Sequence, residues 1–83
     1  MPALYILQST ATEKFYIGSA LDLATRIAEH HRGHSPYTRS RGPWLLVYKE
    51  SYPTLAEARQ RERELKSWKS HRSILELIGR GAG

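Results

Sequence analysis

The sequence contains no cysteine and no long apolar run, and each absence excludes a class of protein. Without cysteine, its 83 residues form neither a disulfide framework nor a thiolate metal site. No apolar stretch approaches the roughly 18 residues that a helix needs to cross a bilayer, and no signal peptide is visible. A chain of this length predicts one domain over residues 1–83 with its core at 3–78, and we expect it in the cytoplasm.

The charge of the chain is mainly of one sign. Thirteen Lys and Arg oppose 8 Asp and Glu, which gives a net charge of +5. Basic proteins attract polyanions, and nucleic acid is the commonest of these, although a merely basic protein is the alternative. Clustering of the charges in two segments favours nucleic acid, and we predict that it is contacted by these side chains: Arg32, Arg39, Arg41, Arg59, Arg61, Arg63, Lys66 and Lys69.

The spacing of apolar residues predicts an α+β fold that begins with a β-hairpin. Residues 3–8 and 14–19 are rich in aromatic and branched side chains and are separated by a short polar loop. Alternation places Tyr5 on one face of the first strand, and Tyr16 on the same face of the second strand as Gly18. A helix over 23–31 should follow, with an inward side formed by Leu23, Ala24, Ile27 and Ala28.

The second half of the chain predicts one more strand and two helices. Residues 44–48 are strongly apolar and predict a strand that is central in the sheet or covered on both faces. Thr54 and Glu57 form a capping box that opens a helix, and a last helix over 70–78 should stop at Gly79. The expected architecture is a small three-stranded antiparallel sheet flanked by helices, in the order β-β-α-β-α-α.

Glu62 stands where the apolar stripe of a helix requires a hydrophobic residue. The stripe consists of Leu55, Ala58, Glu62 and Leu65. A carboxylate at an inward position must be paired, bound to metal or protonated, because an isolated buried charge is very costly. Two interpretations remain open: a salt bridge with a neighbouring arginine, or a ligand for a hard cation such as Mg²⁺.

Four other residues form a candidate site for phosphate chemistry. Tyr5 and Tyr16, which singly are more often core residues, can together present two hydroxyls to one cleft. Arg26 and His30 lie one helical turn apart, so they share a flank of their helix. An arginine can hold a phosphate and lower the pKa of a nearby phenol, while a histidine can move a proton.

These residues, in this order and at these spacings, resemble the GIY-YIG nuclease superfamily, and more narrowly its small stand-alone bacterial members. The first motif reads Ala3-Leu4-Tyr5 where the family has Gly-Ile-Tyr, and the second reads Tyr16-Ile17-Gly18. Arg26 and His30 follow, then a Tyr37-Thr38 loop, the strand Leu46-Val47-Tyr48, and Glu62 within an Arg-Glu-Arg-Glu-Leu-Lys run. The sequence has no asparagine, although many family nucleases carry one near the end of the domain.

The resemblance implies a metal-dependent endonuclease that hydrolyses phosphodiester bonds in nucleic acid, most readily DNA, in repair or recombination. Glu62 would hold one Mg²⁺ or Mn²⁺ ion, and Gly18 would allow a close approach. The implied catalytic residues are Tyr5, Tyr16, Arg26 and His30, and one of the two tyrosines would activate or orient the attacking water. Two alternatives remain: a nucleic-acid-binding module of the same fold with little cleavage activity, and a protein adaptor that uses Trp44 and Trp68 as interface anchors.

Overall fold

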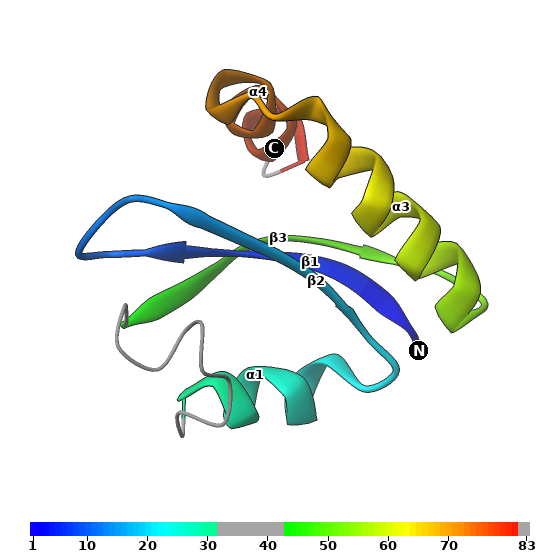
Figure 1. Ribbon diagram of the computed structural model, residues 1–83. Coiled ribbons are helices and arrows are strands. Elements are labelled where there is room, and N and C mark those ends of the chain that lie inside the picture. The colour runs from blue at the N-terminus through cyan, green and yellow to red at the C-terminus, as the bar shows by residue number, and fades with distance from the viewer. Residues whose placement is uncertain (32–42, 82–83) are drawn as a thin grey trace.

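The computed structural model describes residues 1–31 and 43–81, which form one sheet between two layers of helix (Figure 1). The elements are β1 (Ala3–Ser9), β2 (Phe15–Ala20), α1 (Leu23–His31), β3 (Trp44–Ser51), α3 (Leu55–Trp68) and α4 (His71–Gly81). Helix α1 covers one face of the sheet, and α3 and α4 cover the other. The antiparallel three-stranded sheet and the order β-β-α-β-α-α are therefore confirmed. No helix within the described ranges is long and apolar enough to span a membrane.

The sheet has the strand order β2-β1-β3, so the N-terminal strand is the central one. Tyr5 on β1 is paired with Gly18 on β2 and with Lys49 on β3. The expectation that the third strand is central or covered on both faces is wrong. It is an edge strand, and Leu45 and Leu46 are 57% and 42% exposed. Its apolar composition does not make it central, because β1 is almost fully buried and occupies that position.

The two faces of the sheet carry separate cores, as the alternation along the strands requires. The core under α3 and α4 contains Leu4, Ile6, Leu65, Ile74 and Leu77. The core under α1 contains Tyr5, Leu7, Ala20 and Trp44, with Tyr16, Leu23 and Ile27 packed against it. Because Trp44 is buried and Trp68 packs partly buried against the first core, neither tryptophan is a free surface anchor.

Helix α1 turns a different face inward from the one that the apolar pattern predicted. Asp22 begins the helix by accepting hydrogen bonds from the amide and hydroxyl groups of Thr25, at 3.4 and 2.8 Å. Leu23 and Ile27 are half-buried and His30 is buried, whereas both alanines are exposed. The expected burial of Ala24 and Ala28 is therefore wrong, because the larger side chains at 23, 27 and 30 already fill the space against the sheet.

The helices of the second half begin as expected, but the last one does not end as expected. Thr54 caps α3 by accepting a hydrogen bond from the Glu57 amide at 3.3 Å. Helix α4 continues through Gly79 to Gly81, so the prediction of a stop at Gly79 is wrong. A glycine weakens a helix by only about 1 kcal/mol, and Ile74 and Leu77 anchor this helix in the core.

Candidate active site

Two tyrosines and a histidine meet on the α1 face of the sheet. A hydrogen bond of 2.9 Å joins the Tyr5 hydroxyl and Nε2 of His30. The Tyr16 ring centroid lies 5.1 Å from that of His30 and 6.3 Å from that of Tyr5. Tyr5 and His30 are buried and Tyr16 is half-buried, so this cluster has a closed interior and one accessible member. The structure therefore brings together three of the residues that the sequence selected.

Gly18 makes room for the Tyr5 phenol beside the edge strand. A Cβ atom at this position would lie 2.6 Å from the Tyr5 hydroxyl oxygen and 3.2 Å from Cε1 of Tyr16. The Tyr5 ring thus lies across the backbone of β2, which is the edge of the sheet nearest α3. The close approach expected at Gly18 is between the two strands of the hairpin, and the group it accommodates is a catalytic candidate.

The Tyr5 phenol is held in its protonated form. Burial, and then the nearby Tyr16 and Glu62, raise the pKa of Tyr5 far above its ordinary value. The charge of Arg26 lowers that pKa, but it does not outweigh burial. At neutral pH, Tyr5 therefore offers an O–H donor and is not a ready base.

Glu62 projects from α3 to the same edge of the sheet. Its Oε1 accepts a hydrogen bond from the Ser19 hydroxyl of β2 at 2.5 Å, and its Oε2 lies 2.6 Å from the Lys66 ammonium. Its side chain is 21% exposed, against 54% for Lys66. The expected pairing of this inward carboxylate is therefore observed, but with a lysine of the same helix and a serine of β2 in place of an arginine.

The donor atoms around Glu62 fit a hard divalent cation. A carboxylate and a hydroxyl oxygen are the atoms that Mg²⁺ prefers, and this ion usually keeps most of its water shell. The described ranges contain no group of three or more His, Cys, Asp or Glu that would form a dedicated metal cage. The exposed Lys66 can swing away at small cost, because an exposed ion pair contributes little. Glu62 is thus suited to hold an ion that also binds water and substrate.

Arg26 lies at the outer side of the aromatic cluster. Its side chain is 47% exposed, and its Nε lies 3.3 Å from Oε1 of Glu29. The charge of Arg26 lowers the pKa of Tyr5, and the guanidinium remains accessible to solvent. The arginine can therefore meet an incoming phosphate without leaving its place on α1.

The predicted nucleic-acid contacts divide into three groups. Arg59, Arg63 and Lys69 are exposed, while Lys66 is paired with Glu62. Arg61 is held between Glu50 and Glu64, at 3.0 and 2.5 Å, and its side chain is only 22% exposed. The structure thus gives Arg61 a role in fixing α3 to β3. The remaining three, Arg32, Arg39 and Arg41, lie outside the described residues.

Two features escaped prediction from the sequence. Ser19 carries no signal beyond its place next to Gly18, and its contact with Glu62 depends on how α3 packs against β2. Glu50 accepts hydrogen bonds from the hydroxyls of Tyr48 and Tyr52 and from Arg61. The alternation of Tyr48 and Glu50 in β3 with Tyr52 just after its end was the available signal for this cluster, because alternate positions of an extended chain share one side.

Comparisons with known proteins agree with this geometry. Residues 1–74 match the GIY-YIG catalytic domain, and the chain belongs to the GIY-YIG family. Its relatives include the UPF0213 protein SSP2268 of Staphylococcus saprophyticus, which is 42% identical over 67 residues and covers 80% of each chain. A UPF0213 protein of Staphylococcus aureus is 40% identical over 60 residues, covering 71% of this chain and 73% of its own.

A solved structure has the same fold. The solution NMR structure of the UPF0213 protein BH0048 from Bacillus halodurans has a TM-score of 0.63 and is 34% identical, over 100% of this chain and 88% of that one. The chain is thus similar to small bacterial proteins over 73% to 88% of their lengths. Membership of the family implies a nuclease-type catalytic domain with nucleic acid as the general substrate.

Proposed function

We propose that the protein is a divalent-metal-dependent endonuclease that hydrolyses phosphodiester bonds in DNA and selects its target by strand structure, as in repair or recombination. The observation that carries this proposal is the meeting of two groups at one edge of the sheet. The Tyr5–His30 pair reaches that edge across Gly18 on one face, and Glu62 reaches it by its bond to Ser19. The effect of Glu62 on the pKa of Tyr5 links the two groups electrostatically.

Each side chain has a definite task in this mechanism. Glu62 would hold Mg²⁺ or Mn²⁺, and such an ion supplies a Lewis acid that neutralises charge on the phosphate and on the leaving oxygen. The accessible guanidinium of Arg26 would bind a phosphate oxygen as charge develops on it.

The aromatic cluster would handle the proton of the attacking water. Tyr5 keeps its own proton at neutral pH, so it acts as a hydrogen-bond donor that orients its partner. His30 can accept a proton, and Tyr16 provides a hydroxyl at the accessible side of the cluster. The 2.9 Å bond to Tyr5 would thus hold the imidazole in place while Tyr5 keeps its proton, and Tyr16 or His30 would meet the water.

A second candidate function is a nucleic-acid-binding module of the same fold with little cleavage activity. Both carboxylate oxygens of Glu62 have protein partners, and the pKa of Tyr5 is raised, which suits a base poorly. If these contacts persist when DNA is bound, the chain binds without cutting. Cleavage and binding must therefore be measured on the same substrates.

The test is cleavage of end-labelled duplex, single-stranded and branched DNA in Mg²⁺ or Mn²⁺, with EDTA as control. We expect metal-dependent products from the wild type and a loss of at least about 100-fold in Glu62→Gln. Glu57→Gln on the same helix is the matched control, because Glu57 is exposed and glutamine preserves the capping pattern. Binding of all substrates without metal-dependent products would favour the second candidate.

A further inference from the structure

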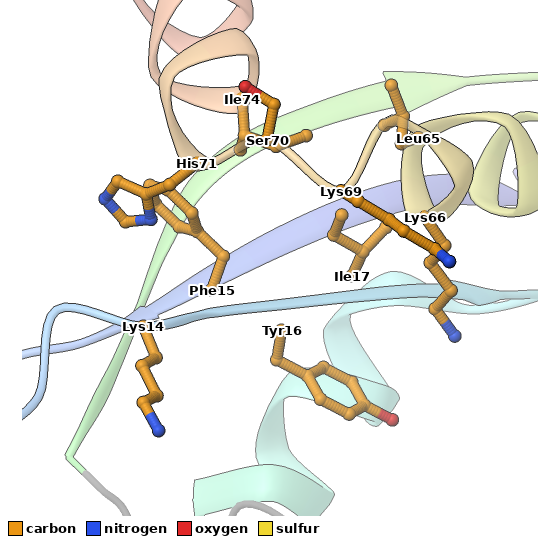
Figure 2. A pocket seen from close by; sticks show the side chains of 10 residues that line it. All are labelled: Lys14, Phe15, Tyr16, Ile17, Leu65, Lys66, Lys69, Ser70, His71 and Ile74. Carbon is orange, nitrogen blue, oxygen red and sulfur yellow. The ribbon is translucent and has the colours of Figure 1, made fainter.

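A groove lies beside β2 on the sheet face opposite α1 (Figure 2). It has a volume of about 540 Å³ and is bounded by β2, the end of α3 and the start of α4. Its floor is apolar and contains Ile17, Leu65 and Ile74. The cleavage mechanism outlined above uses none of these three residues.

Two stacked rings form one end of this groove. The Phe15 and His71 rings have centroids 4.6 Å apart and an interplanar angle of 24°. Phe15 packs against the core and is half-buried, whereas His71 is exposed at the start of α4. Phe15 therefore backs one face of the imidazole, and the exposed histidine can present its other face to a planar ligand. Nucleic-acid bases stack on such surfaces whatever their sequence.

Positive charge lies at the other end. The side chains of Lys66 and Lys69 extend together there, away from the two rings (Figure 2). Lys69 ends α3 in the left-handed conformation, with φ at 50°, and has no carboxylate partner among the described residues. No acidic residue lines the groove, while Lys14 adds a third positive charge. The groove is therefore complementary to a ligand with a flat apolar part and a negative backbone.

The groove and the active site share two residues. Tyr16 borders the groove, and its ring points to the other side of the sheet, where it contacts the Tyr5–His30 cluster (Figure 2). Lys66 lines the groove while its ammonium lies 2.6 Å from Glu62. A strand whose phosphate reaches Glu62 therefore passes Lys66, at the charged end of the groove.

We propose that this groove holds an unpaired nucleotide next to the scissile phosphate, with its base on His71 and its phosphate at Lys66 and Lys69. The choice of nucleic acid as ligand rests on the proposed function. A base within a duplex is stacked on both sides and cannot occupy this surface, whereas an unpaired base can. The groove would thus favour single-stranded or splayed segments over intact duplex.

The test measures binding without cleavage, in EDTA, by fluorescence anisotropy of a labelled single strand and a duplex of the same length. His71→Ala is the main variant because His71 is exposed and its loss should leave the fold intact. We expect it to weaken single-strand binding by at least about fivefold and leave duplex binding within about twofold. Phe15→Leu should have the same selectivity, since leucine keeps the site apolar but removes the ring. A 2-aminopurine base in the single strand should lose fluorescence on binding wild type and less on binding His71→Ala.

The charge contribution is tested with Lys69→Gln against Lys49→Gln, an exposed lysine on the opposite edge strand. Lys69→Gln should weaken binding to both DNAs and reduce the slope of log affinity against log salt by about 1, while Lys49→Gln should change neither. The inference would be overturned if His71→Ala lowered the affinity for single strand and duplex equally, or lowered neither. The inference would also be overturned if polyglutamate competed for the groove as well as unlabelled single-stranded DNA does, because the groove would then be a site for acidic peptides.

The wild-type cleavage assay separates the two proposals. Single-strand binding that depends on His71, without metal-dependent cleavage, would support this groove and reject the nuclease. Cleavage by a wild type whose single-strand binding is insensitive to His71→Ala would support the nuclease and reject the groove.

Discussion

The Tyr5 hydroxyl lies 2.6 Å from the point where a Cβ atom on Gly18 would stand. The two residues are direct partners across β1 and β2, so the side chain of the central strand crosses the backbone of the edge strand. A hydrogen atom at residue 18 is what allows the phenol to reach His30. The glycine of the second family motif, Gly18, therefore provides the space that the tyrosine of the first motif, Tyr5, occupies.

Gly18→Ala should displace the Tyr5 ring and weaken its bond to His30. Because Tyr5 is buried, the ring has little space to yield, and we expect a loss of about 1–3 kcal/mol in the free energy of unfolding, measured with urea. Gly79→Ala is the control, because nothing lies within 4 Å of its Cβ position and the residue is helical. It should stabilise the protein by up to about 1 kcal/mol. If Gly18→Ala left the free energy of unfolding unchanged, the Tyr5 ring would be free to move.

The cluster around Glu50 should control stability at both ends of the pH range. Burial raises the pKa of Glu50, but hydrogen bonds from Tyr48, Tyr52 and Arg61 outweigh it and leave the pKa below its ordinary value. Burial and the bond to Glu50 raise the pKa of both tyrosines to about 12. A lowered carboxyl pKa gives stability that is present above the ordinary Glu pKa and is lost as pH falls. A raised phenol pKa gives stability that is complete below about pH 10 and is lost towards pH 12.

Glu50→Gln should remove much of this pH dependence and cost about 1–3 kcal/mol at neutral pH, because Arg61 and two phenols lose a charged acceptor. The measurement is the free energy of unfolding as a function of pH. Glu64→Gln is matched to it, since Glu64 pairs with the same arginine but its side chain is 53% exposed. That change should stay within about 0.5 kcal/mol. Equal effects of the two substitutions would contradict the structural role of Glu50.

Lys66→Gln should strengthen metal binding to the free protein. The ammonium of Lys66 lies on Oε2 of Glu62 and must leave before an ion can use that oxygen. Because an exposed pair contributes about 0.2–1 kcal/mol, we expect the Kd for Mn²⁺ to fall by roughly twofold to fivefold. Titration of Mn²⁺ by paramagnetic resonance without DNA measures this effect, with Lys49→Gln as control. Weaker binding in Lys66→Gln would show that the lysine does not compete with the ion.

Much of the fold could be predicted from the sequence because periodicity reports which side of an element is buried. Alternation assigned Tyr5 and Tyr16 to one face, and the capping box located the start of α3 at Thr54. The position of β3 at the sheet edge could not be predicted in this way. Strand order depends on which strand pairs twice, and the apolar run at 44–48 is compatible with either place.

The candidate residues of the site could be selected from the sequence, but their contacts could not. Glu62 was visible because a carboxylate interrupts an apolar stripe, yet its partners Ser19 and Lys66 follow from the packing of α3 on β2. The direction of the pKa shift of Tyr5 could not be predicted from the sequence either. Arg26 alone suggested a lowered pKa, whereas the burial of the phenol between β2 and α1 raises it.

The most direct test of this account is a double-mutant cycle on the single-turnover rate of DNA cleavage, using Tyr5→Phe, Glu62→Gln and the combined variant. If the two residues act on one phosphodiester, each single change should lower the rate by at least about 100-fold, and the combined variant should be little slower than the slower single one. Thermal unfolding would verify that all three variants are folded. Rate losses that multiply, or a Tyr5→Phe variant that cuts as fast as wild type, would contradict a single site built from β1, α1 and α3.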